Sequence, residues 1–568
     1  MPKIYFVGVD VGTSSARAAL VRSDGKVLQT IAKSIRIWNT EHEHFEQSSE
    51  DIWNAVCSCV KFVTRDTPKE EIVAISFDAT CSLVILGDNG EPLSVSNTQN
   101  PQQNVIVWMD HRAHKEAEKI NATKHDLLRY VGGQVSVEME LPKLLWLKTN
   151  LYLSTWTKIW RAFDLPDFLT WRSTDCDSRS LCTVICKWNY DGVAMQWNKK
   201  FFQEIDLDEL LNNNAEIIGR SIQEPGTPVG KGLSERAAKE MNLLPGIVVG
   251  TALIDAHAGA LGMFGCNAAH ASCIDNLEGK LALICGTSTC HMSLTREPCS
   301  ADGIWGPYRG AIIPNYYLNE GGQSASGLLL DHIIKTHPQY MHIQLKLKDE
   351  NIFSYLNEML KKMAKERNLD DPCYLTKDLH VWPDFHGNRS PIADPNLKGM
   401  VGGINEWEKK KSESKKKPIF LNSLQISGLN MNMDEESLAV LYLAFVQALA
   451  YGTRHLIANL LGYQRSPFHL LLFCGGLAKN LLYIQCHADI CQLPCLIPDE
   501  QEMVLVGAAM LGACAAKVYD DLKIAAANMG GGGTLLEPQA NTKEYHNRKY
   551  QVFLEMLKDQ SKYKSIMS

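Results

Sequence analysis

The sequence predicts an α/β protein that contains one architecture twice. Residues 4–20, IYFVGVDVGTSSARAAL, read as an apolar strand, a Gly-Thr-Ser turn and a second strand that runs back. Residues 280–294, KLALICGTSTCHMSL, repeat this order. Apolar strands alternate with helical stretches along the chain, which is typical of α/β folds. We therefore expect two similar domains, the first over residues 1–265 and the second over residues 266–568.

The first part of the chain opens with antiparallel strands and a helix. Asp24-Gly25 in SDGK is a hairpin signal between ARAALVR and VLQTIAK. Residues 48–63, SSEDIWNAVCSCVKFV, place apolar side chains at helical spacing behind an N-cap serine and first-turn acids. Residues 71–86, EIVAISFDATCSLVIL, read as one buried strand, and residues 244–262 read as strand, turn and small-residue helix. Asp255 is therefore expected at a strand-to-helix junction.

The second part alternates strands and helices in the same way. Residues 433–457 predict a long apolar helix with an acidic start, and residues 469–490 predict a strand, a Gly-Gly turn and a helix. Residues 406–418, EWEKKKSESKKKP, are rich in lysine. Such a run is typical of a solvated or disordered insertion, with a nuclear-import or anion-binding patch as the alternative.

Composition limits the classes of function. A chain of 568 residues that is 45% hydrophobic can bury more than one core. Its formal net charge of −7 gives no overall attraction to nucleic acids or anionic membranes, so neither is expected as a partner. The 17 cysteines include no CxxC pair, which predicts reduced thiols. We see no signal peptide and no membrane span, and we expect a cytoplasmic protein whose oligomeric state is left open.

Two turns could bind phosphate. A Gly-Thr-Ser turn offers free backbone N–H groups and hydroxyls that can wrap an anion. A single such turn is more often an ordinary hairpin with glycine at positive φ. Because two of them stand at matching places in the repeat, we expect phosphate contacts from five residues: Gly12, Thr13, Ser14, Gly286 and Thr287.

We find no P-loop and no zinc-binding motif in the sequence. GTPVGKG at residues 226–232 and GGGG at residues 530–533 lack the spacing and the neighbours of a P-loop, so we interpret both as turns. His111 and His114 lie close in sequence, but no cysteine and no second histidine pair stands at ligand spacing. We therefore expect no structural zinc.

Nine motifs occur in one order over nearly the whole chain: FVGVDVGTSSARAAL, DATCSLV, WMDHRA, PKLLWLK, GTALIDAHAG, CGTSTC, EGGQSASG, QALAYGTRH and CGGLAKN. Together they resemble the FGGY carbohydrate kinases. The resemblance implies two ribonuclease-H-like domains of the actin, hexokinase and sugar-kinase superfamily, which flank a catalytic cleft. It also implies ATP-dependent phosphorylation of a sugar or polyol hydroxyl in the presence of Mg²⁺.

The resemblance implies roles for two aspartates. Asp10 is expected at the Mg²⁺ and phosphate end of the cleft, with contact through water because Mg²⁺ keeps much of its hydration shell. The alternative for Asp10 is a hydrogen bond to the turn that follows it. Asp255 is the candidate general base, which accepts the proton of the attacking hydroxyl. Its alternative is the capping of the helix that begins near Ala256.

The resemblance also implies which residues bind the two substrates. The sugar is expected to contact Ala79, Thr80, Cys81, Ser82, Asp110, Arg112, Lys187 and Glu320. Lys187 has the alternative of an exposed surface lysine. Gln323 is expected to join Gly286 and Thr287 at the nucleotide phosphates, while the ribose and adenine side is assigned to Gly475, Gly476 and Asn480.

The segment DATCSLV resembles the pentulose-kinase branch of the family, so phosphorylation of D-ribulose is the favoured activity. L-Ribulose, D-xylulose and ribitol are alternative substrates. Two further alternatives are an actin-like nucleotide switch and a catalytically silent sugar sensor. The retained Asp10, Asp255 and Gly-Thr-Ser turns argue against the silent sensor, and the short chain after Tyr550 argues against a chaperone-type switch.

Overall fold

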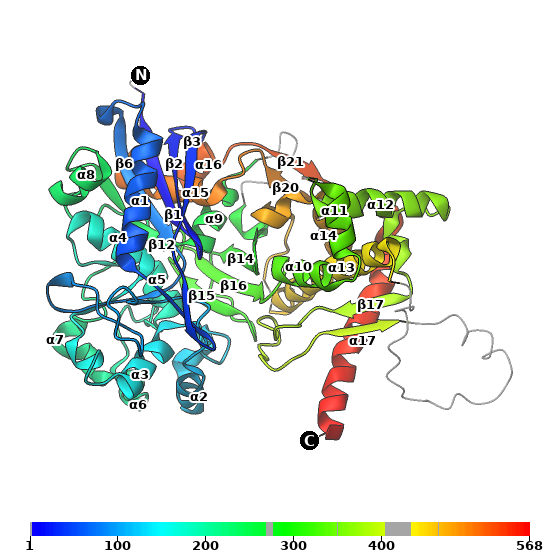
Figure 1. Ribbon diagram of the computed structural model, residues 1–568, viewed down its shortest axis with the longest axis horizontal. Coiled ribbons are helices and arrows are strands. Elements are labelled where there is room, and N and C mark those ends of the chain that lie inside the picture. The colour runs from blue at the N-terminus through cyan, green and yellow to red at the C-terminus, as the bar shows by residue number, and fades with distance from the viewer. Residues whose placement is uncertain (1–2, 268–275, 349, 404–432, 464, 568) are drawn as a thin grey trace.

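Two mixed β-sheets form the centre of the molecule. A computed structural model describes them within residues 3–267, 276–348, 350–403, 433–463 and 465–567. The first sheet has the strand order β12-β6-β1-β2-β3, and the second has the order β15-β16-β14-β13-β19-β20-β21. Figure 1 shows the two sheets in neighbouring parts of the molecule, each with helices packed around it. The lysine-rich run at residues 406–418 lies outside the described residues.

The chain up to residue 264 forms the first sheet and a further five-stranded sheet of short strands, β4-β5-β8-β7-β9, which we call the small sheet. Its elements are β1 (Tyr5–Val11), β2 (Ser15–Arg22), β3 (Val27–Ser34), β4 (Trp38–Glu41), β5 (His44–Gln47), α1 (Ser49–Thr64), β6 (Ile72–Ala79), β7 (Leu83–Leu86), β8 (Val105–Ile106), α2 (His114–Ala122), α3 (Glu140–Asn150), β9 (Arg161–Asp164), α4 (Leu165–Thr174), β10 (Arg179–Ser180), α5 (Leu181–Lys187), α6 (Lys199–Glu204), α7 (Asn212–Ala215), β11 (Ile222–Gln223), α8 (Glu235–Met241), β12 (Val248–Ile254) and α9 (Asp255–Phe264).

The chain from residue 280 forms the second sheet and the helices around it. Its elements are β13 (Lys280–Cys285), β14 (Thr289–Thr295), β15 (Trp305–Arg309), β16 (Tyr317–Gln323), α10 (Gly327–Thr336), α11 (Tyr340–Leu347), α12 (Ile352–Glu366), β17 (Leu379–Trp382), β18 (Met400–Gly403), α13 (Glu435–Gly462), β19 (Leu470–Cys474), α14 (Leu481–Cys491), β20 (Cys495–Pro498), α15 (Met503–Ala515), α16 (Leu522–Met529), β21 (Gly533–Leu536) and α17 (Lys543–Met567).

The two sheets repeat one topology. In the first sheet, β1, β2 and β3 are antiparallel neighbours, and β6 and β12 continue the sheet in parallel with β1. In the second sheet, β13, β14 and β16 are antiparallel neighbours, and β19 and β20 continue in parallel with β13. The predicted two-domain α/β architecture is therefore confirmed. The boundary at residue 265 stays a prediction.

Most of the elements expected from the sequence are present. The hairpin at Asp24-Gly25 joins β2 to β3, and Ser48 caps α1 by accepting a hydrogen bond from Asp51 N at 3.2 Å. One element differs from the prediction: residues 71–86 form two strands rather than one. After β6 the chain leaves the first sheet, with Thr80 N bonded to Val11 O at 2.9 Å, and β7 joins the small sheet. A continuous apolar pattern cannot show this change of sheet, because both strands are buried.

The long helix α13 forms the core of the second part of the chain. The side chain of Asp434 caps its first turn by accepting a hydrogen bond from Ser437 N at 2.8 Å. By length and hydropathy α13 could cross a membrane, but 72% of its apolar window is buried inside the protein. Its packing against α12 and α14 accounts for that composition, as in the core helix of a globular protein.

Helix α15 returns from the second part of the chain to the first sheet. It packs against α9 and along β1, β6 and β12, and Figure 1 shows α15 and α16 beside the strands of the N-terminal part. Glycines allow this close approach: a Cβ atom on Gly8 would lie 2.1 Å from Leu505 O, and one on Gly507 would lie 1.9 Å from Ala258 O. The two parts of the chain are therefore interlocked through α9 and α15.

Candidate active site

Three aspartates meet at the carboxyl ends of adjacent parallel strands. Asp10 in β1 pairs in register with Asp78 in β6, and Asp78 pairs with Leu253 in β12. Asp255 follows β12 directly as the first residue of α9. The carboxyl edge of a parallel sheet is the usual place for a ligand in α/β proteins. Asp78 was not among the predicted site residues, although FDA repeats the strand position of VDV and could have revealed it.

Asp10 is balanced by an arginine from the neighbouring strand. It is 1% exposed, and its Oδ2 accepts a hydrogen bond from Arg17 Nε at 2.6 Å. The second part of the chain also contacts this arginine, because Arg17 Nη1 donates to Oε2 of Glu502, the residue before α15, at 3.2 Å. Among the described contacts Asp10 bonds to no group of the turn that follows it, so the ion pair with Arg17 replaces the turn alternative.

Asp78 and Asp255 are held in conditions that disfavour their charged forms. Asp78 is fully buried, and neither of its carboxylate oxygens has a hydrogen-bond partner among the described residues. Burial, followed by the proximity of Asp10, raises the pKa of Asp78 well above its usual range. Burial and then Asp10 likewise raise the pKa of Asp255 to about 7. A group with such a pKa can exchange a proton near neutral pH.

Asp255 does not act as a helix N-cap. Its Oδ1 accepts a hydrogen bond at 2.6 Å from the N–H of Ala256, the next residue. An N-cap side chain instead accepts from the second or third helical residue, and the N-cap position of α9 is occupied by Ile254. The Asp255 carboxylate is therefore not used up by helix capping and can accept a further hydrogen bond.

The donor set of this edge fits a divalent cation. Three carboxylates converge there, and the bond and ion pair of Arg17 go to Asp10 and Glu502 rather than to Asp78 or Asp255. Leaving the two oxygens of Asp78 buried without a partner is costly. A cation coordinated by oxygen ligands or by their water molecules would offset that cost.

A second group of charges lies where the sugar-binding residues were predicted. Lys187, at the end of α5, is 4% exposed, and its Nζ lies 4.4 Å from the ring centroid of Trp305. The alternative of an exposed lysine is therefore wrong. Glu320 in β16 accepts a hydrogen bond from Arg389 at 2.9 Å, and its other oxygen lies 3.7 Å from His257 Nε2. Arg389 was not among the predicted site residues, because nothing in its local sequence HGNRSP indicates a contact with Glu320, about 70 residues earlier.

The electrostatic influence of these charges reaches the first sheet. Lys187 lowers the pKa of Glu320, although burial opposes the decrease, and Arg389 acts in the same direction. Lys187 also opposes the rise in the pKa of Asp255 and of Cys81, so its charge is felt both at the candidate base and at the segment DATCSLV. Ala79, Thr80, Cys81 and Ser82 are all buried in that segment.

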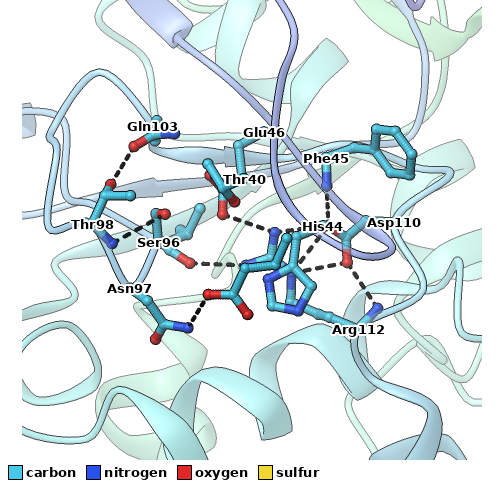
Figure 2. Close-up of polar contacts among 12 residues, drawn as sticks. Thr40, His44, Phe45, Glu46, Ser96, Asn97, Thr98, Gln103, Asp110 and Arg112 are labelled. Carbon is cyan, nitrogen blue, oxygen red and sulfur yellow. Dashed lines mark hydrogen bonds and ion pairs between the residues drawn. The ribbon is translucent and has the colours of Figure 1, made fainter.

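Asp110 and Arg112 belong to a separate buried network, which Figure 2 shows. Arg112 Nε donates to both carboxylate oxygens of Asp110, at 2.9 and 3.0 Å, and one of its Nη groups donates to Glu46 at 2.9 Å. Phe45 N donates to Asp110 Oδ2 at 2.6 Å. Their bonding capacity is used within the protein, which favours positioning of the loop over direct contact with a ligand. Direct sugar contact by these two residues stays a prediction.

The two Gly-Thr-Ser turns occupy equivalent places in their sheets. Each joins the first two strands of its sheet, and each glycine N–H bonds to a carbonyl two or three residues on: Gly12 to Ser15 O at 3.0 Å and Gly286 to Ser288 O at 2.9 Å. Neither glycine has a positive φ, so the ordinary-hairpin explanation does not account for them. A Cβ atom on either would meet only one ordinary contact, at 3.8 Å, which leaves room beside the backbone.

The remaining predicted nucleotide residues follow β19, except Gln323, which is the last residue of β16. Gly475 has φ +92°, and its Cβ would lie 2.5 Å from Cys285 O, whereas a Cβ on Gly476 would meet nothing within 4 Å. Gln323 donates to Leu449 O at 2.7 Å and leaves its Oε1 unpartnered. Asn480 is buried and bonded to Tyr442 OH at 2.6 Å, which directs its amide into the protein. Space for a ligand is therefore greatest at Gly476.

Comparison with known proteins agrees with this architecture. The N-terminal domain of the FGGY family of carbohydrate kinases matches residues 5–262, and the C-terminal domain of that family matches residues 281–516. The FGGY carbohydrate kinase domain-containing protein of Xenopus laevis is 44% identical, over 100% of this chain and 98% of its own length. A D-ribulokinase of Saccharomyces cerevisiae is 36% identical, over 91% of this chain and 72% of its own length.

Among solved structures, the xylulose kinase of Lactobacillus acidophilus shares the fold, with a TM-score of 0.77 at 16% identity over 99% of this chain and 100% of that one. The strand topology, the family match and the relatives agree over most of the chain. The chain belongs to the FGGY family of carbohydrate kinases and is a sugar kinase.

Proposed function

We propose that this sugar kinase is an ATP-dependent pentulose kinase that converts D-ribulose to D-ribulose 5-phosphate. The observation that carries the proposal is the position of Asp255, a half-buried carboxylate that directly follows β12 at the edge where Asp10 and Asp78 lie, with a pKa raised to about 7 by desolvation and by Asp10. The similarity to the yeast D-ribulokinase supports the choice of sugar. The pentulose-like segment DATCSLV and its proximity to Lys187 point in the same direction.

In the proposed reaction the 5-hydroxyl oxygen of the sugar attacks the γ-phosphorus of ATP. The hydroxyl proton passes to Asp255, and the bond between the γ-phosphorus and the bridging oxygen breaks to release ADP. Lys187 and Glu320 hold the sugar hydroxyls by donating and accepting hydrogen bonds. Mg²⁺, which Asp10 and Asp78 would hold through water, supplies charge neutralisation at the phosphates.

The two parts of the chain have different roles in this proposal. Residues 1–265 supply the base and most of the sugar contacts, and residues 266–568 supply the nucleotide contacts. Gly12, Thr13, Gly286 and Thr287 lie against the phosphates, and adenosine lies over Gly476. We place the enzyme in the cytosol, because all cysteines of the described residues are free thiols.

The proposal is tested by an ADP-release assay with D-ribulose, L-ribulose, D-xylulose, ribitol, glycerol and no sugar. D-Ribulose should give the highest kcat/KM. If L-ribulose or D-xylulose ranks first, the assignment of D-ribulose is wrong although a pentulose kinase stands; if ribitol or glycerol ranks first, the pentulose assignment is wrong as well. ADP release that is independent of every sugar would favour a nucleotide switch, and binding of sugar without ADP release would favour a sensor.

A further inference from the structure

Three potential metal ligands meet beside the turn between β4 and β5. Glu43 lies in that turn, and His111 and His114 lie at the start of α2. Their donor atoms are all within 4.8 Å of one another, and His114 Nε2 is 3.8 Å from Glu43 Oε2. Glu138 adds a second carboxylate, 4.0 Å from His111 Nε2. The expectation of no metal at His111 and His114 rested on the lack of a third ligand nearby in sequence, and the fold brings one from about 70 residues away.

The backbone holds these groups in place. His111 N donates to Glu43 O at 3.1 Å, and two residues further along the turn Phe45 N donates to the carboxylate of Asp110. Figure 2 shows how Arg112 in turn fixes Asp110. The turn is therefore tied on both sides to the loop that carries the histidines. A site whose supporting residues are already fixed loses little entropy when a ligand binds.

The surroundings of the two histidines also suit a metal. His111 is half-buried, the ring centroids of His111 and His114 are 5.6 Å apart, and Glu138 Oε1 lies 4.0 Å from His111 Nε2. Glu43 has φ +64°, an uncommon conformation for a glutamate and one that places its side chain beside His114. Imidazole nitrogens and carboxylate oxygens, both of which are metal ligands, therefore face one another at this point.

We propose that Glu43, His111 and His114 form a binding site for a divalent transition-metal ion, with Zn²⁺ as the chemically matched occupant. Two imidazoles and one carboxylate form a donor set that Zn²⁺ accepts, with water in the fourth position. Mg²⁺ prefers oxygen ligands and would bind poorly there. Zinc bonds of about 2.0–2.1 Å put tetrahedral donors roughly 3.3 Å apart, so the side chains must close by about 1 Å. His114, at 56% exposure, is free to make that movement.

The site also touches the second part of the chain. The ring of His386, in the loop that follows β17, stacks on His111 with a centroid distance of 6.2 Å and an interplanar angle of 27°. A metal that fixes the His111 ring would therefore fix one contact between the two parts of the molecule. His386 is not a member of the three-residue donor set, and we assign it packing rather than coordination.

The test is titration of the reduced, metal-free full-length protein with Co²⁺ and Zn²⁺, followed by visible absorption and by calorimetry. We expect one site per chain, cobalt bands without a thiolate charge-transfer band, and negligible heat with Mg²⁺. The absence of the thiolate band matters because Cys182, Cys186 and His257 form a second, fully buried group that could hold a metal. A thiolate band, or no binding of either metal, would overturn the proposal.

Variants identify the ligands without touching the predicted sugar residues. His114→Ala and Glu43→Gln should each weaken Zn²⁺ at least tenfold, since loss of even an indirect partner of a metal ligand costs about 10–100-fold. Three controls should bind Zn²⁺ as the unchanged protein does: His386→Ala, Cys186→Ser and His342→Ala. His342 is exposed and 4.0 Å from Glu435 but lacks a second histidine. Equal affinity in His114→Ala and the unchanged protein would place the metal elsewhere.

Discussion

At the scale of single residues, the main feature is the Asp255 carboxylate, whose charged form is disfavoured at the position that we propose for the general base. Asp255 is half-buried at the edge where Asp10 and Asp78 lie, and its Oδ1 accepts a backbone hydrogen bond. Asn at this position keeps the shape and the contact to Ala256 but cannot take a proton.

We expect Asp255→Asn to lower kcat about 10²–10⁴-fold, the usual contribution of a positioned base. ATP and sugar should still bind, because the side-chain volume and the neighbouring charges are nearly unchanged. Steady-state kinetics and calorimetric titration with each substrate check this. Turnover close to that of the unchanged enzyme would show that another group accepts the proton.

The raised pKa of Asp255 also sets the pH dependence. Burial, followed by the charge of Asp10, raises its pKa to about 7, so the protonated, inactive form dominates at lower pH. The kcat/KM for the sugar should fall about tenfold per pH unit below the pKa and level off above it. A profile that is flat from about pH 5 to pH 8 would contradict a base in this environment.

At the scale of secondary-structure elements, the turns after β1, β13 and β19 carry the glycines that we predict to lie beside the nucleotide. Gly475 and Gly476 are adjacent but differ in constraint. Gly475 is fixed by its positive φ and by the carbonyl of Cys285, while Gly476 faces open space.

We expect Gly476→Leu to fold and to raise the KM for ATP far more than the KM for the sugar, because the new side chain occupies space proposed for adenosine. Gly462→Leu is the matched control, since a Cβ there also meets nothing within 4 Å but lies at the end of α13. Equal increases in both KM values would move the adenosine site away from this turn.

Much of the secondary structure could be predicted from the sequence. The repeated strand–turn–strand pattern, the capped helices and the junction at Asp255 all depend on local periodicity and turn chemistry. The break between β6 and β7 could not, because two buried strands in different sheets have the same apolar pattern. Arg17, Arg389 and Glu43 were missed for a related reason: their partners are set by which strands and turns the fold brings together.

At the scale of the whole molecule, α15 joins what the sequence suggests are separate domains. Gly507 of α15 lets it lie directly on α9, and Gly8 of β1 allows the close approach to that strand. The helix that begins with the candidate base is therefore supported by a segment from the far end of the chain.

We expect Gly507→Val to lower the melting temperature markedly, because even its Cβ would lie 1.9 Å from Ala258 O, a backbone atom that cannot move aside cheaply. Overpacking of this kind typically costs about 1–3 kcal/mol. Thermal unfolding followed by circular dichroism measures the effect. Gly462→Val, at an open position, should unfold near the temperature of the unchanged protein, and similar melting of both variants would show that α15 can shift freely.

The repeated topology has a consequence for the charge at the centre of the molecule. The two copies of this arrangement share the order and directions of their central strands, and they differ at one informative place. The register that pairs Asp10 with Asp78 in the first copy pairs Ile284 with Cys474 in the second. A Cβ on Gly259 of α9 would lie 3.3 Å from Ile284 and 3.7 Å from Cys474. Where the first sheet carries two acids, the second thus presents two neutral side chains, and the helix that begins with the candidate base packs against them.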